Sequence, residues 1–176
     1  VDAGATGNQI IEKDLNLILT RKLEKELVSR GATVYLTRED DKDLSTTTVN
    51  RKRSDLYNRA KYINKISPNM YISIHLNSVT NSSWRGLQVF YTTKSEENKL
   101  IAETITNHLR KNMSNVREIK KDNTYYMYKH ITSPGVLIEA GFISNSNDSY
   151  LLRNKEYQDK LISSISDSIE IYFQKK

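Results

Sequence analysis

The sequence predicts an α/β fold of three layers, α/β/α, in which helices cover both faces of a mostly parallel mixed sheet. Two observations support this prediction. Segments whose apolar residues recur at helical spacing alternate with short runs rich in β-branched and aromatic residues, which is the order typical of sheets with crossover helices. The length of 176 residues is that of one domain, and no internal repeat or linker-like segment divides the chain.

The first predicted helix follows a glycine-containing lead-in, VDAGATG. Leucines and isoleucines then recur at intervals of three and four residues, which predicts an amphipathic helix that ends near Gly31. A threonine-rich polar stretch further along suits an exposed loop over or beside a site. In order, we expect a helix over residues 11–30, a strand over 32–37, an exposed loop over 38–54 and a helix over 54–66.

The C-terminal part contains three short runs that are typical of strands. Ser95 has the side chain of a helix N-cap and precedes an apolar pattern at helical spacing. The stretch 125–131 is too short to assign. The predicted elements are strands over 70–75 and 86–91, a helix over 95–113, a loop over 114–124, a strand over 136–140, a polar turn and a helix over 155–173.

The composition excludes several kinds of site and partner. There is no cysteine, so disulfides, thiolate metal sites and cysteine nucleophiles are excluded. The 27 Lys and Arg residues against 21 Asp and Glu give a net charge of +6, which favours anionic partners. Because the basic residues are scattered, we interpret them as a solvated surface and expect no nucleic-acid partner. No apolar run approaches the roughly 18 residues of a membrane span, so we expect no stable membrane insertion of this segment.

Two polar residues interrupt predicted strands near their carboxyl ends, where open α/β sheets bind ligands. His75 ends the run MYISIH, and Glu139 lies near the end of VLIEA. Each residue alone could be structural, since single histidines and glutamates are commonly held by hydrogen bonds or basic neighbours. Together they indicate a site, because the apolar neighbours of Glu139 would desolvate its carboxylate and raise its pKa toward that of a general base.

Glu12 and His75 have the donor atoms of a catalytic zinc site, which takes three protein ligands and leaves one position open for water. Only these two are good ligands in the sequence. Asp2 is a further candidate because it lies close to Glu12 along the chain, although the glycines around it indicate a turn. His130 could approach the site, but we interpret it as a loop residue that bonds substrate or backbone. His108 lies within a predicted helix, and we interpret it as packed or exposed.

Two other functions stay open on the residues alone. Glu12 and Glu139 could act as the paired carboxylates of a glycosidase, which would leave His75 without a role. The chain could instead be a binding or partner-regulated domain whose metal site is incomplete on its own. Treatment with a chelator separates the first alternative from a zinc enzyme, since a glycosidase of this kind needs no metal.

The segments GATG, IIEKDLNL, SIHLN and IEAGFISN follow one another in this order along the chain. Together they resemble the zinc-dependent N-acetylmuramoyl-L-alanine amidases of the third amidase type. VYLTREDD and DLYNRAKYIN match as well, so the resemblance covers essentially the whole chain. Within the family, KRSDLYNRAKYIN and FYTTKSEENKLIAETI are similar to the germination-specific, spore-cortex amidases of endospore-forming bacteria. The implied fold resembles that of zinc exopeptidases and phosphorylase/hydrolase-like proteins, here as a single catalytic amidase domain over residues 1–176.

The resemblance implies roles for individual residues. Glu12 and His75 correspond to ligands of Zn²⁺, and Glu139 corresponds to the catalytic glutamate. The family's other ligand is a histidine in a DPGHGG-like turn, which we expect upstream of Val1. That turn and the first strand of the fold are accordingly expected to be absent from this chain. Substrate-binding roles are expected for Asn77, Lys129 and His130. Lys129 takes the place of an arginine that many relatives have near the substrate.

The activity implied by the resemblance is hydrolysis of the amide between the lactyl group of N-acetylmuramic acid and the L-alanine of the stem peptide in peptidoglycan. Zinc-activated water would attack with a glutamate as general base. In spore-cortex relatives this reaction precedes the formation of muramic δ-lactam. The resemblance also implies export to a place outside the cytoplasm, between the forespore membranes or in the cell wall, and is compatible with a regulatory protein partner.

Overall fold

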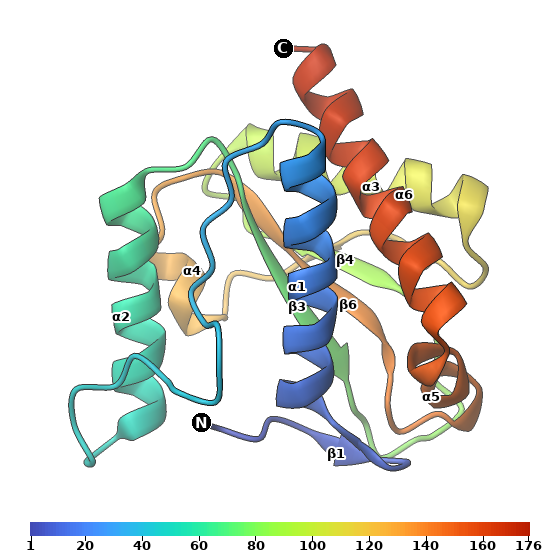
Figure 1. Cartoon of the computed structure of the whole chain (residues 1–176), viewed down its shortest axis with the longest axis horizontal. Coiled ribbons are helices and arrows are strands. Elements are labelled where there is room, and N and C mark those ends of the chain that lie inside the picture. The colour runs from blue at the N-terminus through green and yellow to red at the C-terminus, as the bar shows by residue number, and fades with distance from the viewer.

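The computed structural model describes all 176 residues and has the predicted α/β architecture (Figure 1). Its main sheet has four strands in the order β3-β6-β4-β5. β3 is parallel to β6 and β5 is parallel to β4, whereas β4 and β6 are antiparallel, so the sheet is mixed and mostly parallel. The strands are β3 Tyr71–Asn77, β4 Gln88–Tyr91, β5 Lys120–Lys121 and β6 Gly135–Phe142, and a separate hairpin joins β1 Thr6–Gly7 to β2 Ile10–Ile11.

Helices lie on both faces of the main sheet, which confirms the three-layer arrangement. One layer contains α1, α3 and α6, which pack on one another, and α2 packs on α4 on the opposite face. None of the helices combines the length and the apolar character that a membrane crossing requires. The helices are α1 Glu12–Ser29, α2 Arg51–Ile66, α3 Glu96–Asn112, α4 Tyr126–His130, α5 Ser146–Arg153 and α6 Lys155–Gln174.

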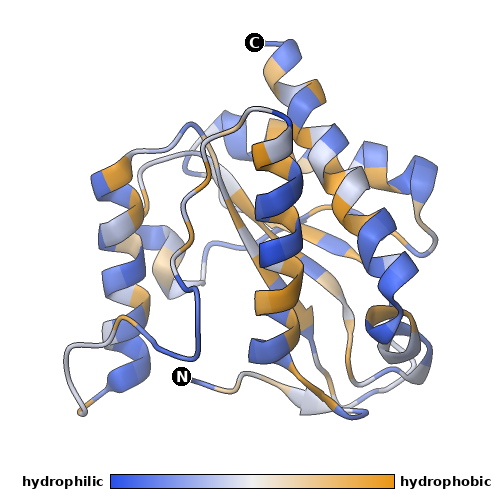
Figure 2. Ribbon diagram, viewed as in Figure 1, coloured by the Kyte–Doolittle hydropathy of each residue, from blue (hydrophilic) through white to orange (hydrophobic).

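Side chains alternate between the two faces along β6, and two separate apolar clusters result. Val136, Ile138 and Ala140 belong to a cluster of 22 buried residues that includes the inner faces of α1, α3 and α6. Leu137 belongs to a cluster of seven buried residues on the side of α2 and α4. Glu139 alternates in phase with Leu137 and therefore faces the α2/α4 side. In Figure 2, α1 and α6 carry both hydrophobic and hydrophilic residues, as expected of helices with one face on a sheet.

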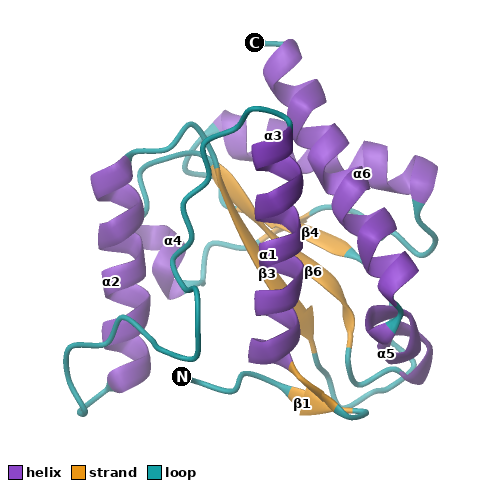
Figure 3. Cartoon of the chain, viewed as in Figure 1, coloured by secondary structure: helices purple, strands orange, loops and turns teal.

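The predicted strand over residues 32–37 is wrong. These residues have no regular secondary structure, and Figure 3 draws them as a loop that leaves α1. A strand needs a neighbouring strand to satisfy its backbone groups, and the order β3-β6-β4-β5 places none beside this segment. Tyr35 is 57% exposed, so the segment also lacks the burial that would favour a strand. The β-branched and aromatic composition of this run was therefore a misleading signal.

Besides the hairpin of β1 and β2, three short elements lie outside the predicted set. α5 takes the place of the polar turn expected after β6, and Asn145 caps it by accepting hydrogen bonds from the N–H groups of Asn147 and Asp148 at 3.1 Å. The unassigned stretch 125–131 contains α4, and the predicted loop 114–124 contains β5. The other predicted helices and strands are confirmed, with ends that differ by at most three residues.

Candidate active site

Glu12 is the first residue of α1, and the lead-in VDAGATG wraps around its carboxylate. Its Oε2 accepts a hydrogen bond from the N–H of Ala5 at 2.7 Å. Gly4 has a φ of +68°, and a Cβ there would lie 2.4 Å from Oε2 of Glu12, so this close approach requires glycine. Burial alone would raise the pKa of Glu12, but hydrogen bonds from His75 and Ala5 outweigh it and lower the pKa. The carboxylate is therefore ionised at neutral pH.

His75 lies near the carboxyl end of β3 and links Glu12 to Ser73. Its Nδ1 is 3.0 Å from Oε1 of Glu12, and its Nε2 is 3.1 Å from Oγ of Ser73. Ser73 and His75 are two positions apart in a strand, so both point to the α2/α4 side. Burial raises the pKa of Tyr128 of α4 well above its usual value, and Ser73 on this side opposes the rise. Ser73 therefore fixes the imidazole orientation, and neither Ser73 nor Tyr128 was predicted as a site residue.

Glu139 is directly opposite His75 in the register of β6 and β3, so the two side chains share one face of the sheet. The residue is only 7% exposed, and its Oε2 is buried without a hydrogen-bond partner. Burial raises the pKa of Glu139 to about 7, while His75 opposes this rise and Glu12 adds to it. A carboxyl group that titrates near neutral pH can both accept and return a proton.

Tyr125, the N-cap residue of α4, is a further residue on which the charge of Glu139 acts. Burial raises the pKa of Tyr125 to about 12, and the charge of Glu139 adds to this rise. Its ring packs on those of Phe90 and Tyr128, with centroids 6.4 Å and 5.4 Å apart. In the sequence, the aromatic run TYYMY over residues 124–128 was the available signal for this part of the site, but it is too short to predict a helix or a strand.

The three predicted substrate-binding residues have different surroundings, with Asn77 at the end of β3 and the carbonyl of His130 bonded to Asn64 near the end of α2. Asn77 ends β3 and alternates in phase with His75, so it lies on the site's face of the sheet. Lys129 is exposed on α4. His130 packs its ring against Tyr57 of α2 and Tyr126 of α4, with centroids 5.9 Å and 4.8 Å apart. No hydrogen bond joins these three side chains to Glu12 or Glu139.

The two remaining candidates have partners elsewhere. The carboxylate of Asp2 accepts a hydrogen bond from the N–H of Gly4 and forms an ion pair with Lys52 at 2.6 Å, so it serves the turn. Lys52 and Gly4 together lower the pKa of Asp2. His108 lies between helices, with its Nε2 3.5 Å from Asp167 of α6. Neither residue is brought to Glu12.

The chemistry of Glu12 and His75 fits part of a zinc site. A carboxylate oxygen and an imidazole nitrogen are two of the ligand types that zinc prefers, and a catalytic zinc takes three. No group of three or more His, Cys, Asp or Glu side chains that could hold a metal ion is present. The facing atoms Nδ1 and Oε1 therefore supply two ligand positions, and the unpartnered Oε2 of Glu139 supplies a free acceptor on the same face.

A protein family and a named relative match almost the whole chain. The family model described as N-acetylmuramoyl-L-alanine amidase matches residues 1–171. The germination-specific N-acetylmuramoyl-L-alanine amidase of Bacillus subtilis (strain 168) is 41% identical over 180 residues, which cover 99% of this chain and 76% of that protein.

Solved structures share the fold across the whole chain. The CwlD amidase of Clostridioides difficile, in complex with the GerS lipoprotein, matches with a TM-score of 0.94 and 35% identity, covering 100% of this chain and 94% of that one. The catalytic domain of CwlV, an N-acetylmuramoyl-L-alanine amidase from Bacillus (Paenibacillus) polymyxa var. colistinus, matches with a TM-score of 0.85 and 28% identity, covering 99% and 93%. This chain belongs to the N-acetylmuramoyl-L-alanine amidase family.

Proposed function

We propose that the amidase reaction of this chain is the hydrolysis of the bond between the lactyl group of N-acetylmuramic acid and L-alanine in peptidoglycan, with Glu139 as its general base. The observation that carries this assignment is the buried, unpartnered carboxylate oxygen of Glu139 opposite His75, with a pKa raised to about 7. Family membership removes the reason to treat Glu12 and Glu139 as a glycosidase pair.

Glu12 and His75 would hold Zn²⁺, together with a histidine that the family resemblance places upstream of Val1. When bound, zinc lowers the pKa of its water to about 7 and polarises a carbonyl group. Ser73 keeps the imidazole of His75 oriented, since Nε2 lies 3.1 Å from its hydroxyl oxygen. The ionised carboxylate of Glu12, which accepts a hydrogen bond from Ala5, would supply negative charge to the proposed Zn²⁺ position.

Glu139 performs the proton transfers in this proposal. Its free Oε2 takes a proton from the attacking water, because no other group in the protein competes for that oxygen. The same carboxyl then returns the proton to the departing amine of L-alanine, so one residue acts as base and acid in turn. A pKa near neutrality suits both steps, whereas a fully solvated glutamate would be too weak a base.

The substrate would lie across the open part of the α2/α4 face. We include Asn77, Lys129 and His130 in its binding, because Asn77 shares the face of His75 and the other two form the exposed end of α4. Tyr125 joins them as a wall residue beside Glu139. The amphipathic ring of a tyrosine suits contact with a sugar or a peptide.

The experiment is release of stem peptides from purified sacculi by the full-length protein, with zinc content measured in each sample. We expect Glu139→Gln to lower kcat by about 10²- to 10⁴-fold, the contribution usual for a general base, while zinc content is retained. Glu103→Gln, an exposed carboxylate on α3, is the matched control and should behave as wild type. Equal activity of wild type and Glu139→Gln would overturn the assignment.

The biological setting proposed is the spore cortex, at a place outside the cytoplasm. The named relative with 41% identity is germination-specific, which supports this setting. Purified cortex peptidoglycan and vegetative sacculi, offered separately at equal muramic acid content, test it. Faster release from cortex material is expected, and faster release from vegetative sacculi would contradict the cortex role.

A protein partner is a second part of this proposal. It rests on the structure with a TM-score of 0.94, a CwlD amidase in complex with the GerS lipoprotein. A partner that stabilises the metal-bound form would raise zinc affinity by mass action. Calorimetry on the full-length protein is the test, since nanomolar zinc binding without a partner would remove the need for one.

A further inference from the structure

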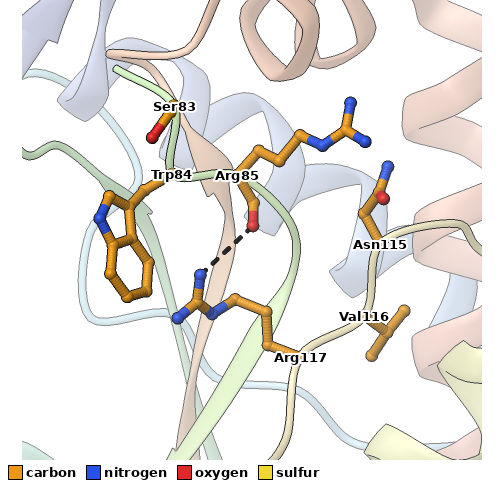
Figure 4. Close-up of a pocket in the computed structure, with 6 residues that line it drawn as sticks. All are labelled: Ser83, Trp84, Arg85, Asn115, Val116 and Arg117. Atoms are coloured by element: carbon orange, nitrogen blue, oxygen red, sulfur yellow. Dashed lines mark hydrogen bonds between the residues drawn. The ribbon is translucent and has the colours of Figure 1, made fainter. Parts of the chain in front are cut away.

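A pocket with a volume of about 360 Å³ opens between two loops at the carboxyl end of β6 (Figure 4). One loop precedes β4, and the other precedes β5. None of the residues around it belongs to the proposed metal site or the general base. The lining residues are Ser83, Trp84, Arg85, Asn115, Val116 and Arg117.

Arg117 is stacked between two aromatic rings at this pocket. Its Cζ lies 4.4 Å from the ring centroid of Trp84 and 5.6 Å from that of Phe142. One guanidinium nitrogen donates a hydrogen bond to the carbonyl oxygen of Arg85 at 3.5 Å, drawn as the dashed line in Figure 4. The Nε atom is buried and has no hydrogen-bond partner. The stacking holds the planar guanidinium in one orientation, and its second terminal nitrogen, Nη2, makes no hydrogen bond within the protein.

The positive charge at this pocket is not neutralised within the protein. The arginines that form ion pairs are others: Arg21, Arg30, Arg51, Arg59 and Arg110. The carboxylate next in sequence, Glu118, is held by Arg110. Arg117 therefore presents an uncompensated guanidinium group over Trp84, a residue that is 48% exposed, while the side chain of Arg85 extends away from Trp84 toward Asn115 and adds a second unpaired charge (Figure 4). Guanidinium groups are well suited to bind carboxylates through paired hydrogen bonds.

The pocket is built on a rigid frame. The buried Asp148 accepts hydrogen bonds at one carboxylate oxygen from the N–H groups of Gly86, at 2.7 Å, and Phe142, at 2.9 Å. The two loops are also joined directly, because the N–H of Leu87 donates to Asn115 at 2.9 Å and a Cβ on Gly86 would lie 2.1 Å from that same oxygen. Such a frame positions the floor and the rim of the pocket before any ligand binds.

The pocket and the general base lie on the same face of the sheet. Phe142 is paired with Asn77, which shares the face of His75, so the ring under Arg117 points to the side of Glu139. Phe142 follows Glu139 by three residues in β6. At the rise of about 3.3 Å per residue in a strand, the two positions are about 10 Å apart. An extended peptide whose scissile bond lies at Glu139 spans about 7 Å with two residues and about 10 Å with three, so its second and third residues are the ones nearest to Phe142.

We propose that Arg117, stacked on Trp84, binds a carboxylate of the stem peptide two or three residues beyond the scissile amide, and that Arg85 adds positive charge at the rim of the pocket. This inference rests on the proposed amidase function and adds a specificity site to it. The exposed indole of Trp84 contacts the aliphatic part of the same peptide residue. The site selects stem peptides with a free carboxylate over those in which it is amidated.

The test uses three soluble N-acetylmuramyl tripeptides: one with free carboxyl groups, one amidated on the second residue and one amidated on the third. Calorimetry measures their binding to the full-length Glu139→Gln protein, and kcat/KM is measured on the active enzyme. We expect amidation at one of the two positions to weaken binding about tenfold, the loss usual for a charge-assisted pair. Adding Arg117→Gln should abolish this preference. Arg85→Gln should reduce it, and because Arg85 is exposed, this second variant is less able to disturb the fold. Arg21→Gln, an exposed arginine of α1, is the matched control and should keep the preference.

Two results would overturn the proposal. One is equal binding of all three peptides to the unsubstituted Glu139→Gln protein. The other is that both arginine variants weaken binding of all three peptides by the same factor, as lost packing would. Failure of the proposed function looks different: the active enzyme would release no peptide while the binding preference persisted.

Discussion

The two faces of the main sheet are formed by the same strands but serve different purposes. The face toward α1, α3 and α6 is covered by apolar side chains, in a cluster of 22 buried residues. The face toward α2 and α4 has a cluster of seven, and beyond it lie Ser73, His75 and Glu139. Because neighbouring residues of a strand point to opposite faces, Ile138 and Glu139 sit side by side in sequence with different roles. Residues that stabilise the fold and residues of the proposed active site therefore alternate along the same strand.

This separation explains how the fold tolerates a buried carboxylate. An ionised group with an unsatisfied oxygen destabilises a folded protein, and Glu139 has one. Ile138 and Val136, both at most 1% exposed, are held in the large cluster and keep β6 in place. The pKa of Glu139 raised to about 7 reflects the same burial. Substitutions on one face should therefore change the free energy of unfolding, and substitutions on the other should change metal binding or turnover.

The largest expected effect on stability comes from the apolar face. Ile138→Ala should lower the free energy of unfolding by about 3–4 kcal/mol, because a fully buried isoleucine is truncated in a packed cluster. Urea denaturation monitored by circular dichroism measures the change. Leu100→Ala, in which the leucine is 51% exposed on α3, is the control and should stay within about 0.5 kcal/mol of wild type. Equal losses in the two variants would mean that the apolar face does not carry the stability.

On the face that carries Ser73, His75 and Glu139, a smaller effect is expected, and the quantity affected is zinc affinity. Ser73→Ala removes the hydroxyl beside Nε2 of His75 and should weaken zinc binding about 10- to 100-fold, with little change in unfolding. Competition with a chelator measures the affinity of the full-length protein. Ser29→Ala, an exposed serine at the end of α1, is the control. Unchanged zinc affinity in Ser73→Ala would show that the hydroxyl does not orient His75.

The smallest effect is expected outside both faces. The ion pair between Arg110 and Glu118 joins exposed side chains, so Glu118→Gln should change stability by no more than about 0.5 kcal/mol. The same denaturation experiment applies, at low and at physiological salt. A loss above about 1 kcal/mol would mean that this surface contributes more than the comparison of the two faces allows.

Most of the fold followed from periodicity, and the exceptions have physical reasons. The pattern of α1 and the alternation in β6 report burial directly, so both were predicted within two residues. The run 32–37 has strand-like composition, but pairing depends on what lies beside a segment, which local composition does not encode. α5 was missed because a polar, asparagine-rich segment resembles a turn. The signal for a helix was Asn145 as the N-cap residue, followed by the acidic Asp148 in the first turn.

The site was predictable to a different degree. Glu12, His75 and Glu139 stand out because each interrupts or begins an otherwise apolar element, and the structure brings them together. Ser73 and Tyr125 were not predicted, since a serine in a strand and a tyrosine in a short aromatic run are ordinary in sequence. Their importance arises only in the folded protein, where Ser73 contacts His75 and the charge of Glu139 acts on Tyr125.

The pH dependence of stability tests the buried carboxylate at the centre of this account. The pKa of Glu139 is raised from an ordinary value of 4.5 to about 7 in the folded protein, so the folded state binds this proton more tightly than the unfolded chain does. That contribution to stability is fully present below about pH 4.5 and is lost as the pH rises to about 7. Above pH 7 the folded protein carries a buried charge that glutamine would not have.

The most direct measurement is the free energy of unfolding of chelator-treated wild type and Glu139→Gln at pH 4.5 and pH 8, with amidase activity measured on the zinc-loaded proteins. We predict that the variant becomes more stable relative to wild type by about 1–3 kcal/mol between pH 4.5 and pH 8, while its activity falls at least about 100-fold. A stability difference that is the same at both pH values, together with retained activity, would contradict the account.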